Sequence, residues 1–329
     1  MLRMPGTRGV ITAAIVLVAA LAAPGAASAD SLVYVKGGNV WLARPDGSHA
    51  HRVTRDGTRR LPYVHPTQAD NGTIVALRAT DTHRFTPRGR RLGRPRKVSA
   101  GLSGPGSLHE LAEASEVSPN GKRVALQKTL LQGTSSNGIK GMNILAVSVE
   151  YRSAKTGRRQ REVHQAGDYY QSPSWVGNNR LLVFAPYNSY APEVFVDTFG
   201  ASTEGWFSDE HSGEPDPFGR QPIDDGELNR AGDRIAFVRG TNVNGDWSGA
   251  MFEVDAVSSL SEIPTPFCSF VPPGPGPFSG PSWSPDGTGL AWSNRTGVWT
   301  ATLNPSDGDC GVTPRLVARG GRAPDWSAG

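Results

Sequence analysis

The sequence predicts an all-β protein, a six-bladed β-propeller. Three observations lead to this fold class. Glycine and proline are abundant, with 40 and 26 copies among 329 residues, and apolar runs are short, as in proteins with many short strands joined by turns. Stretches with the helical period are nearly absent. A turn-and-strand motif recurs six times, at intervals near the roughly 40 to 50 residues of one four-stranded blade.

The first 29 residues have the layout of a cleaved secretory signal. Arg3 and Arg8 precede an apolar run from 10 to 23, and the small residues Ala27-Ser28-Ala29 follow. The run is shorter than the roughly 20 residues of a membrane-spanning helix, which disfavours the alternative of an anchor. We expect cleavage after Ala29, export to the cell envelope or the medium, no membrane span after cleavage, and one domain over residues 30–329.

The clearest copy of the repeat reads Pro-Ser-Trp-Ser-Pro-Asp-Gly at 281–287, followed by the apolar strand Leu290-Ala291-Trp292. Asp, Asn and Gly tolerate the backbone conformations of tight turns, so each copy predicts a hairpin followed by a buried strand. The six turns are centred at residues 72, 121, 178, 232, 287 and 329, with gaps of 49, 57, 54, 55 and 42 residues.

A second motif accompanies the first. Val-Trp at 40–41 leads to Pro-Asp-Gly at 45–47 and Arg-Val-Thr at 52–54, and a matching series runs from 298 to 317. Together the two motifs resemble the TolB-type β-propeller repeat over essentially the whole chain after the leader. The resemblance implies a propeller, usually of six blades, but not one activity. The sequence has no room for the N-terminal α/β domain of TolB, so TolB's specific envelope role is not expected to transfer.

The two ends of the chain complement each other. The last turn motif lacks its apolar strand, and the apolar strand at 32–35 lacks a preceding turn motif. We therefore expect the N-terminal strand to close the propeller by joining the C-terminal blade, in one sheet with residues 297–303 and 314–318. Closure would remove the open sheet edge that invites aggregation.

Cys268 and Cys310 are the two cysteines of the chain. An even pair in an exported protein favours a disulfide over two free thiols. Each cysteine follows a corresponding hairpin strand, at 251–255 and at 298–303, so the bridge would join two neighbouring blades.

No catalytic constellation, metal site or cofactor motif emerges. The sequence has no Gly-x-Ser-x-Gly elbow. His49 and His51 are spaced to share one face of a strand, but such a pair on a hairpin is more often plain surface. Acidic residues are dense from 204 to 227, where eight Asp or Glu stand against Arg220 alone. This stretch could hold a pair of catalytic carboxylates as glycosidases do, but nothing in it fixes their spacing.

The tryptophans fall into two groups. Trp175, Trp283 and Trp326 stand beside the turn motif, and their repeated placement predicts packing between blades. Trp206 and Trp247 lie off the repeat, where they would contact a ligand or support their own loops, two alternatives that stay open.

The charges are unevenly distributed. Residues 52 to 97 hold twelve Lys or Arg against Asp56, Asp70 and Asp81. Two interpretations are a solvated outer surface and a face that steers a charged partner.

Export, a closed scaffold and irregular loops together favour a secreted or surface-held monomer that binds a protein or a cell-envelope polymer. The alternative is a carbohydrate-active enzyme with acidic and aromatic loop residues at the propeller mouth. Clustered His, Arg and carboxylate groups at the channel would favour the enzyme. Nucleic-acid binding is not expected, because the cations lie in one blade and no recognised nucleic-acid module is present.

Overall fold

The fold is taken from a computed structural model that describes residues 30–99, 101, 108–136, 139–163, 171–185, 193–198, 203–208, 223–239 and 250–328. The expected leader, residues 1–29, lies outside the described residues. Within them every regular element is a β-strand. No helix in the described ranges is long and apolar enough to cross a membrane.

The described strands form six four-stranded antiparallel sheets. The first sheet contains β24 (Gly321–Ser327), β1 (Ser31–Lys36), β2 (Asn39–Ala43) and β3 (His51–Arg52). The second contains β4 (Val64–Gln68), β5 (Ile74–Arg78), β6 (Asp81–Phe85) and β7 (Arg96–Lys97). The third contains β8 (Leu108–Val117), β9 (Arg123–Ser136), β10 (Ile139–Ser153) and β11 (Arg159–Val163).

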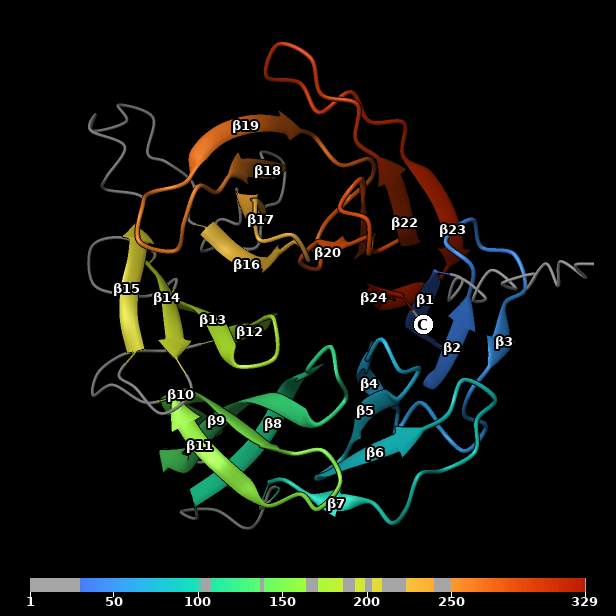
Figure 1. The fold of residues 1–329 in the computed structure, drawn as a ribbon. Coiled ribbons are helices and arrows are strands. Elements are labelled where there is room, and N and C mark those ends of the chain that lie inside the picture. Colours follow the sequence, from blue (N-terminus) through green and yellow to red (C-terminus); the bar gives the residue numbers. More distant parts are fainter. Residues whose placement is uncertain are drawn as a thin grey trace, which may run out of the picture.

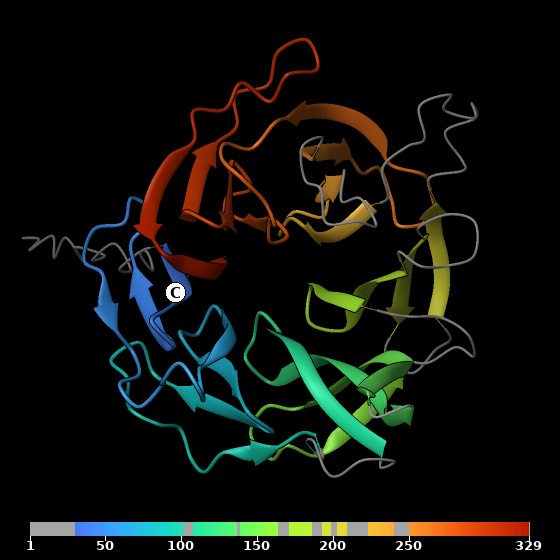
Figure 2. The same cartoon turned by 180° about the vertical axis from the view of Figure 1, so that it is seen from behind.

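The other three sheets follow the same plan. The fourth contains β12 (Gln171–Val176), β13 (Arg180–Ala185), β14 (Glu193–Thr198) and β15 (Thr203–Ser208). The fifth contains β16 (Ile223–Leu228), β17 (Arg234–Arg239), β18 (Met251–Ala256) and β19 (Thr265–Phe270). The sixth contains β20 (Ser282–Trp283), β21 (Gly289–Asn294), β22 (Gly297–Thr302) and β23 (Arg315–Arg319). The sheets stand radially around a central axis, each with its first strand innermost (Figures 1 and 2). This is a β-propeller, as the sequence predicts.

The turn motif lies between the first and second strands of a sheet. In the sixth sheet, Ser284 Oγ donates to Asp286, and the Gly287 N–H donates to the Ser284 carbonyl. Gly287 has φ +70°, a conformation that a residue with a Cβ rarely adopts. Equivalent hydrogen bonds run from Gly121 to Ser118 and from Gly232 to Asn229. The sequence motif therefore marks the hairpin at the inner edge of each sheet.

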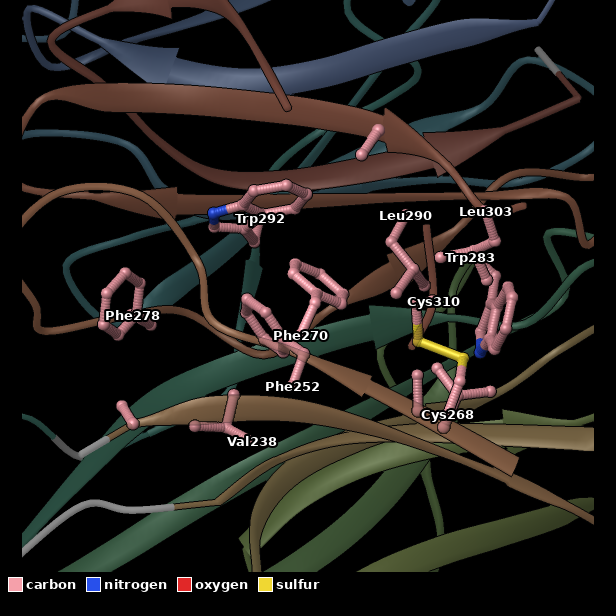
Figure 3. Packing of buried hydrophobic residues seen from close by; sticks show 14 residues of the cluster. Val238, Phe252, Cys268, Phe270, Phe278, Trp283, Leu290, Trp292, Leu303 and Cys310 are labelled. Atoms are coloured by element: carbon pink, nitrogen blue, oxygen red, sulfur yellow. A yellow bond between two sulfur atoms is a disulfide. The ribbon is translucent and has the colours of Figure 1, made fainter. Parts of the chain in front are cut away.

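The strand after the turn is buried on both faces, because it lies between two neighbouring sheets. All six residues of β21 are buried, which explains the unbroken apolar run at its centre. Between the fifth and sixth sheets, Trp292 contacts Phe252 and Phe270 at ring-centroid distances of 5.5 Å each (Figure 3). Each inter-sheet space has its own apolar cluster of this kind, and burial of these surfaces drives the sheets together.

Tryptophans beside the turn tie neighbouring sheets. Trp175 Nε1–H donates to the Glu116 carbonyl at 2.9 Å, and Trp283 Nε1–H donates to the Glu227 carbonyl at 2.8 Å. Each acceptor belongs to the innermost strand of the preceding sheet. The predicted role of these residues in packing between blades is confirmed for both.

The N-terminal strand pairs with a different strand from the one expected. β1 lies between β2 and β24, with Leu32 opposite Trp326. Residues 297–303 and 314–318 instead contribute β22 and β23 to the sixth sheet, so placing 32–35 in their sheet was wrong. The physical reason is that the sixth sheet is already complete with β20 to β23. The last turn motif therefore belongs to the first sheet, where β24 is the inner strand and β1 is the second strand.

The disulfide joins two sheets as expected. Cys268 lies in β19 and Cys310 in the segment between β22 and β23, with Cα atoms 4.9 Å apart. Both side chains are buried at the edge of the cluster that contains Trp292 (Figure 3). The backbones also pair there, since the Ser269 N–H donates to the Gly308 carbonyl and the Cys310 N–H donates to the Ser269 carbonyl.

Replacing Cys268 and Cys310 together by alanine should lower the free energy of unfolding by about 3 to 4 kcal/mol. The bridge spans 42 residues, and its loss frees that loop in the unfolded chain. Urea unfolding of the variant and the parent measures the difference, and Cys268→Ala alone should lose a similar amount. Two thiols that alkylate without reductant, or an unchanged unfolding midpoint, would contradict the bridge.

Candidate functional site

The innermost strands each place one side chain at an equivalent position around the axis. These residues, called the channel ring below, are Thr67, Glu116, Ser174, Glu227, Ser282 and Asp325. In five of the inner strands, the ring residue comes directly before the apolar or aromatic residue that opens the turn. In β4, the residue after Thr67 is the polar Gln68. A repeat that serves packing therefore also delivers six short polar side chains to the axis.

The channel ring links neighbouring sheets through hydrogen bonds. Thr67 Oγ1 accepts from the Val117 N–H at 2.9 Å, and Ser282 Oγ accepts from the Trp326 N–H at 3.0 Å. Asp325 Oδ2 accepts from the Gln68 N–H. Each of these bonds runs from one ring side chain to the backbone of the next inner strand. The same pattern at successive junctions fixes the ring side chains, because their acceptor atoms are already engaged.

Three members of the channel ring are carboxylic acids, and they influence one another. Burial in the channel wall is the largest cause that raises the pKa of each group. The negative charge of Asp325 adds to this for Glu116 and Glu227, so that the pKa of Glu227 rises to about 8 and that of Glu116 lies well above its usual range. The pKa of Asp325 rises to about 6. Like charges confined to one narrow space disfavour full ionisation, so the ring retains protons near neutral pH.

One end of the channel is spanned by an ion pair. Arg230, in the turn after β16, contacts Asp70, in the turn after β4, with nitrogen–oxygen distances of 2.6 and 3.1 Å. The two residues belong to the fifth and second sheets, which lie opposite each other around the axis (Figure 1). The positive charge of Arg230 partly offsets the raised pKa values of the ring acids. Between this pair and the ring lies a small cavity of about 50 Å³.

The other end opens into a cavity of about 240 Å³ lined by all six innermost strands. Glu116, Ser174, Glu227 and Asp325 line both cavities, so the ring stands between them. In four of the six inner strands, the residue two positions before the ring has a positive φ. His65, Ser172, Asp225 and Ala323 have φ between +36° and +49° at these places, a conformation that is uncommon outside glycine and that collects at functional sites.

The walls of the larger cavity, called the channel mouth below, are polar. Asp225 Oδ2 accepts from the Gly280 N–H at 2.8 Å, and a Cβ at position 280 would lie 2.3 Å from the Asp225 carboxyl carbon. Glycine is therefore required for this approach. Glu113 accepts from Thr129 Oγ1. Burial lowers the pKa of His65, and the charge of Glu113 offsets part of that shift. The mouth is acidic, and the His65 side chain lies on its wall.

The structure distributes the residues singled out in the sequence among different environments. Trp206 is buried, packs edge-on against Phe207 at 5.0 Å and donates from Nε1 to the Glu262 carbonyl at 2.8 Å. Trp206 therefore belongs to a core cluster. Of the two alternatives, this favours a packing role over contact with a ligand. Trp247 lies outside the described residues. His51 uses both ring nitrogens in contacts with the carbonyls of His49 and Pro87.

Of the acidic stretch, Asp225 and Glu227 reach the channel, whereas residues 209–222 lie outside the described ranges. Among the described residues, no group of three His, Cys, Asp or Glu side chains could hold a metal ion. Sequence reasoning missed Glu116 and Asp325 as channel residues. The signal was present in the repeat, as the polar residue that precedes the turn, but the motif alone suggested packing.

Comparison with known proteins supports the fold. A structure of TolB from Acinetobacter baumannii superposes with a TM-score of 0.56 at 15% identity, covering 90% of this chain and 66% of that protein. The chain has the fold of a TolB-type β-propeller. A second structure, assigned to TolB of Agrobacterium tumefaciens, gives a TM-score of 0.54 at 11% identity and covers 89% of this chain and 91% of that one. No protein-family model and no curated protein matches the sequence.

The raised pKa of Glu227 predicts a pH dependence of stability. A carboxyl group whose pKa is about 8 in the folded state and 4.5 ordinarily holds its proton more tightly when folded, so stability falls as pH rises between these values. Because glutamine does not titrate, Glu227→Gln should lose less stability than the parent as the pH rises. From about pH 5 to about pH 8.5, the free energy of unfolding of the variant should improve by about 1 to 2 kcal/mol relative to the parent.

Urea unfolding at the two pH values measures this difference. Glu162→Gln, at an exposed position paired with Arg159, serves as the matched control and should follow the parent. If Glu227→Gln and the parent lose the same stability on going to pH 8.5, the channel acids do not carry the protons assigned to them.

Proposed function

We propose that residues 30–329 form a closed six-bladed propeller that acts outside the cytoplasm as a binding module, holding a protein partner at the channel mouth. Support for the ring comes from contacts between consecutive inner strands, which run from β24 through β4, β8, β12, β16 and β20 and back to β24. Support for export comes from the leader and from the disulfide between Cys268 and Cys310, a bond that persists in oxidising compartments.

The observation that carries the proposal is the cavity of about 240 Å³, to which all six inner strands contribute. Its volume suits one or a few side chains rather than a folded domain. An inserted segment of a partner would end at the channel ring, since Arg230 and Asp70 span the far end. A rigid, concave site at the centre of a scaffold is where ligands bind in many folds.

The chemistry of the mouth favours a cationic group. Glu113 and Asp225 line the cavity, and the ring acids lie beneath them. A lysine, an arginine or a terminal amine of the partner would pair with these carboxylates through charge-assisted hydrogen bonds, which are stronger than those between neutral groups. Binding of a cation would also displace protons from the ring, because a nearby positive charge lowers the pKa of a carboxyl group.

The double variant Glu113→Gln/Asp225→Asn should lose the partner. Both changes keep the hydrogen-bond acceptors for Thr129 and Gly280 and remove two negative charges. Pull-down from the envelope fraction of the producing organism, with quantitative mass spectrometry, compares the parent, this variant and Glu162→Gln/Glu262→Gln as the control. We expect one protein enriched by the parent and the control and at least about tenfold less by the mouth variant, a loss of about 1.4 kcal/mol or more.

Equal recovery by all three proteins would contradict binding at the mouth. The channel also presents the clustered histidine and carboxylates that favour the carbohydrate-active alternative, with Glu227 as a protonated acid at neutral pH. Release of reducing sugars from envelope glycans by the parent, abolished in Glu227→Gln, would replace the binding function by that alternative.

A further inference from the structure

The outer edges of the first two sheets carry a run of arginines that the channel does not use. Six exposed side chains, Arg55, Arg59, Arg60, Arg88, Arg90 and Arg94, are called the basic band below. Three follow β3, and three precede β7. Both strands lie at the periphery of the molecule (Figure 1), and none of the six arginines lines the cavity at the channel mouth.

The two halves of the band form one surface, because the segments that carry them pack together. His51 Nε2 lies 3.0 Å from the Pro87 carbonyl. Arg91 contacts the Asp56 carboxylate at 2.6 Å. The third sheet continues the surface, since Gly157 in the turn before β11 lies against Arg96, and Lys155 and Arg158 in the same turn are exposed.

The positive charge of the band is not neutralised by neighbouring acids. Asp56 is the acidic residue within the segment that follows β3, and it already pairs with Arg78 and Arg91. Asp70 pairs with Arg230 at the channel end. None of the six arginines has an ion pair with a described residue. The pKa of Arg84 lies below its usual value because of burial and the positive charge of Arg96, which shows that cations crowd here.

We propose that the basic band binds a linear polymer of phosphodiester-linked sugars or polyols. All six side chains are arginine, whose planar guanidinium matches the oxygens of a phosphate group in bidentate fashion. A chain with one charge per repeat can pair with successive arginines and release their counterions. The proposal concerns a surface separate from the channel mouth and stands whether or not a protein binds there.

The shape of the band disfavours a bilayer and a nucleic acid. It spans two successive sheets, which turn around the circumference of the molecule (Figures 1 and 2), so a planar bilayer would meet only part of it. Among the described residues of the band segments, Leu61 is the exposed large apolar side chain, whereas surface-bound proteins insert several. The guanidinium carbon of Arg52 lies 5.1 Å from the centre of the Trp41 ring. This face of the indole is therefore covered and poorly placed to stack on bases.

The test is fluorescence-anisotropy titration of the chain with labelled poly(glycerol phosphate). Arg55→Gln/Arg59→Gln/Arg60→Gln/Arg94→Gln should weaken binding at least about tenfold at low salt and flatten its salt dependence. The control Lys122→Gln/Arg180→Gln/Arg295→Gln/Arg322→Gln removes the same charge from exposed positions outside the band and should bind like the parent. A third variant with lysine at the four band positions should recover part of the affinity, because lysine restores the charge but not the bidentate geometry. Any recovery separates lost charge from lost folding.

Three results would overturn the proposal. Equal weakening in the glutamine variant and the control would mean that net charge alone attracts the polymer. Tighter binding of the parent to phosphatidylglycerol vesicles, polygalacturonate or single-stranded DNA would assign the band to a bilayer, a carboxylate polymer or a nucleic acid. Absence of measurable binding to poly(glycerol phosphate) would remove the function altogether.

Discussion

The pairing of β1 with β24 is the contact on which the rest of the structure depends. It joins residues nearly three hundred positions apart, with Ser31 opposite Ser327 and Leu32 opposite Trp326. β24 has no other neighbour within its sheet, so β1 provides all of its strand-to-strand pairing. Asp325 reaches the channel from β24 and accepts the Gln68 N–H of the next sheet. Without the pairing, the channel would lose one wall and one of its three acids, and two buried sheet faces would be exposed to water.

The packing between sheets and the chemistry of the channel are built from the same residues. The carbonyls of Glu116 and Glu227 accept hydrogen bonds from Trp175 and Trp283, while their carboxyl groups line the channel. The indoles therefore fix the backbone from which the acids project. The apolar burial that stabilises neighbouring sheets offsets the cost of holding several carboxylic acids in one narrow space. That cost is visible in their raised pKa values.

The sequence predicts the local features of this fold well, because hairpins are determined by nearby residues. Gly121 and Gly287 sit in the turns expected of them, and the apolar run that contains Trp292 forms a strand buried on both faces. Features set by distant residues were harder to predict. Trp206 finds its partner at Glu262, and the strand at 32–35 joins β24 rather than β22. The channel acids come from different repeats and converge only in three dimensions, so their shared site could not be seen from spacing.

Hydrogen exchange in β1 tests the central claim, a ring held together at the junction of the chain ends, most directly. If β1 is locked between β2 and β24, the amides of Leu32 and Val33 can exchange only when the whole domain unfolds. Their protection should then equal that of Leu290 and Trp292 in the buried strand β21 and should decrease in parallel with it as urea is added. Exchange of the β1 amides that is orders of magnitude faster, and independent of urea while β21 stays protected, would contradict the closed ring.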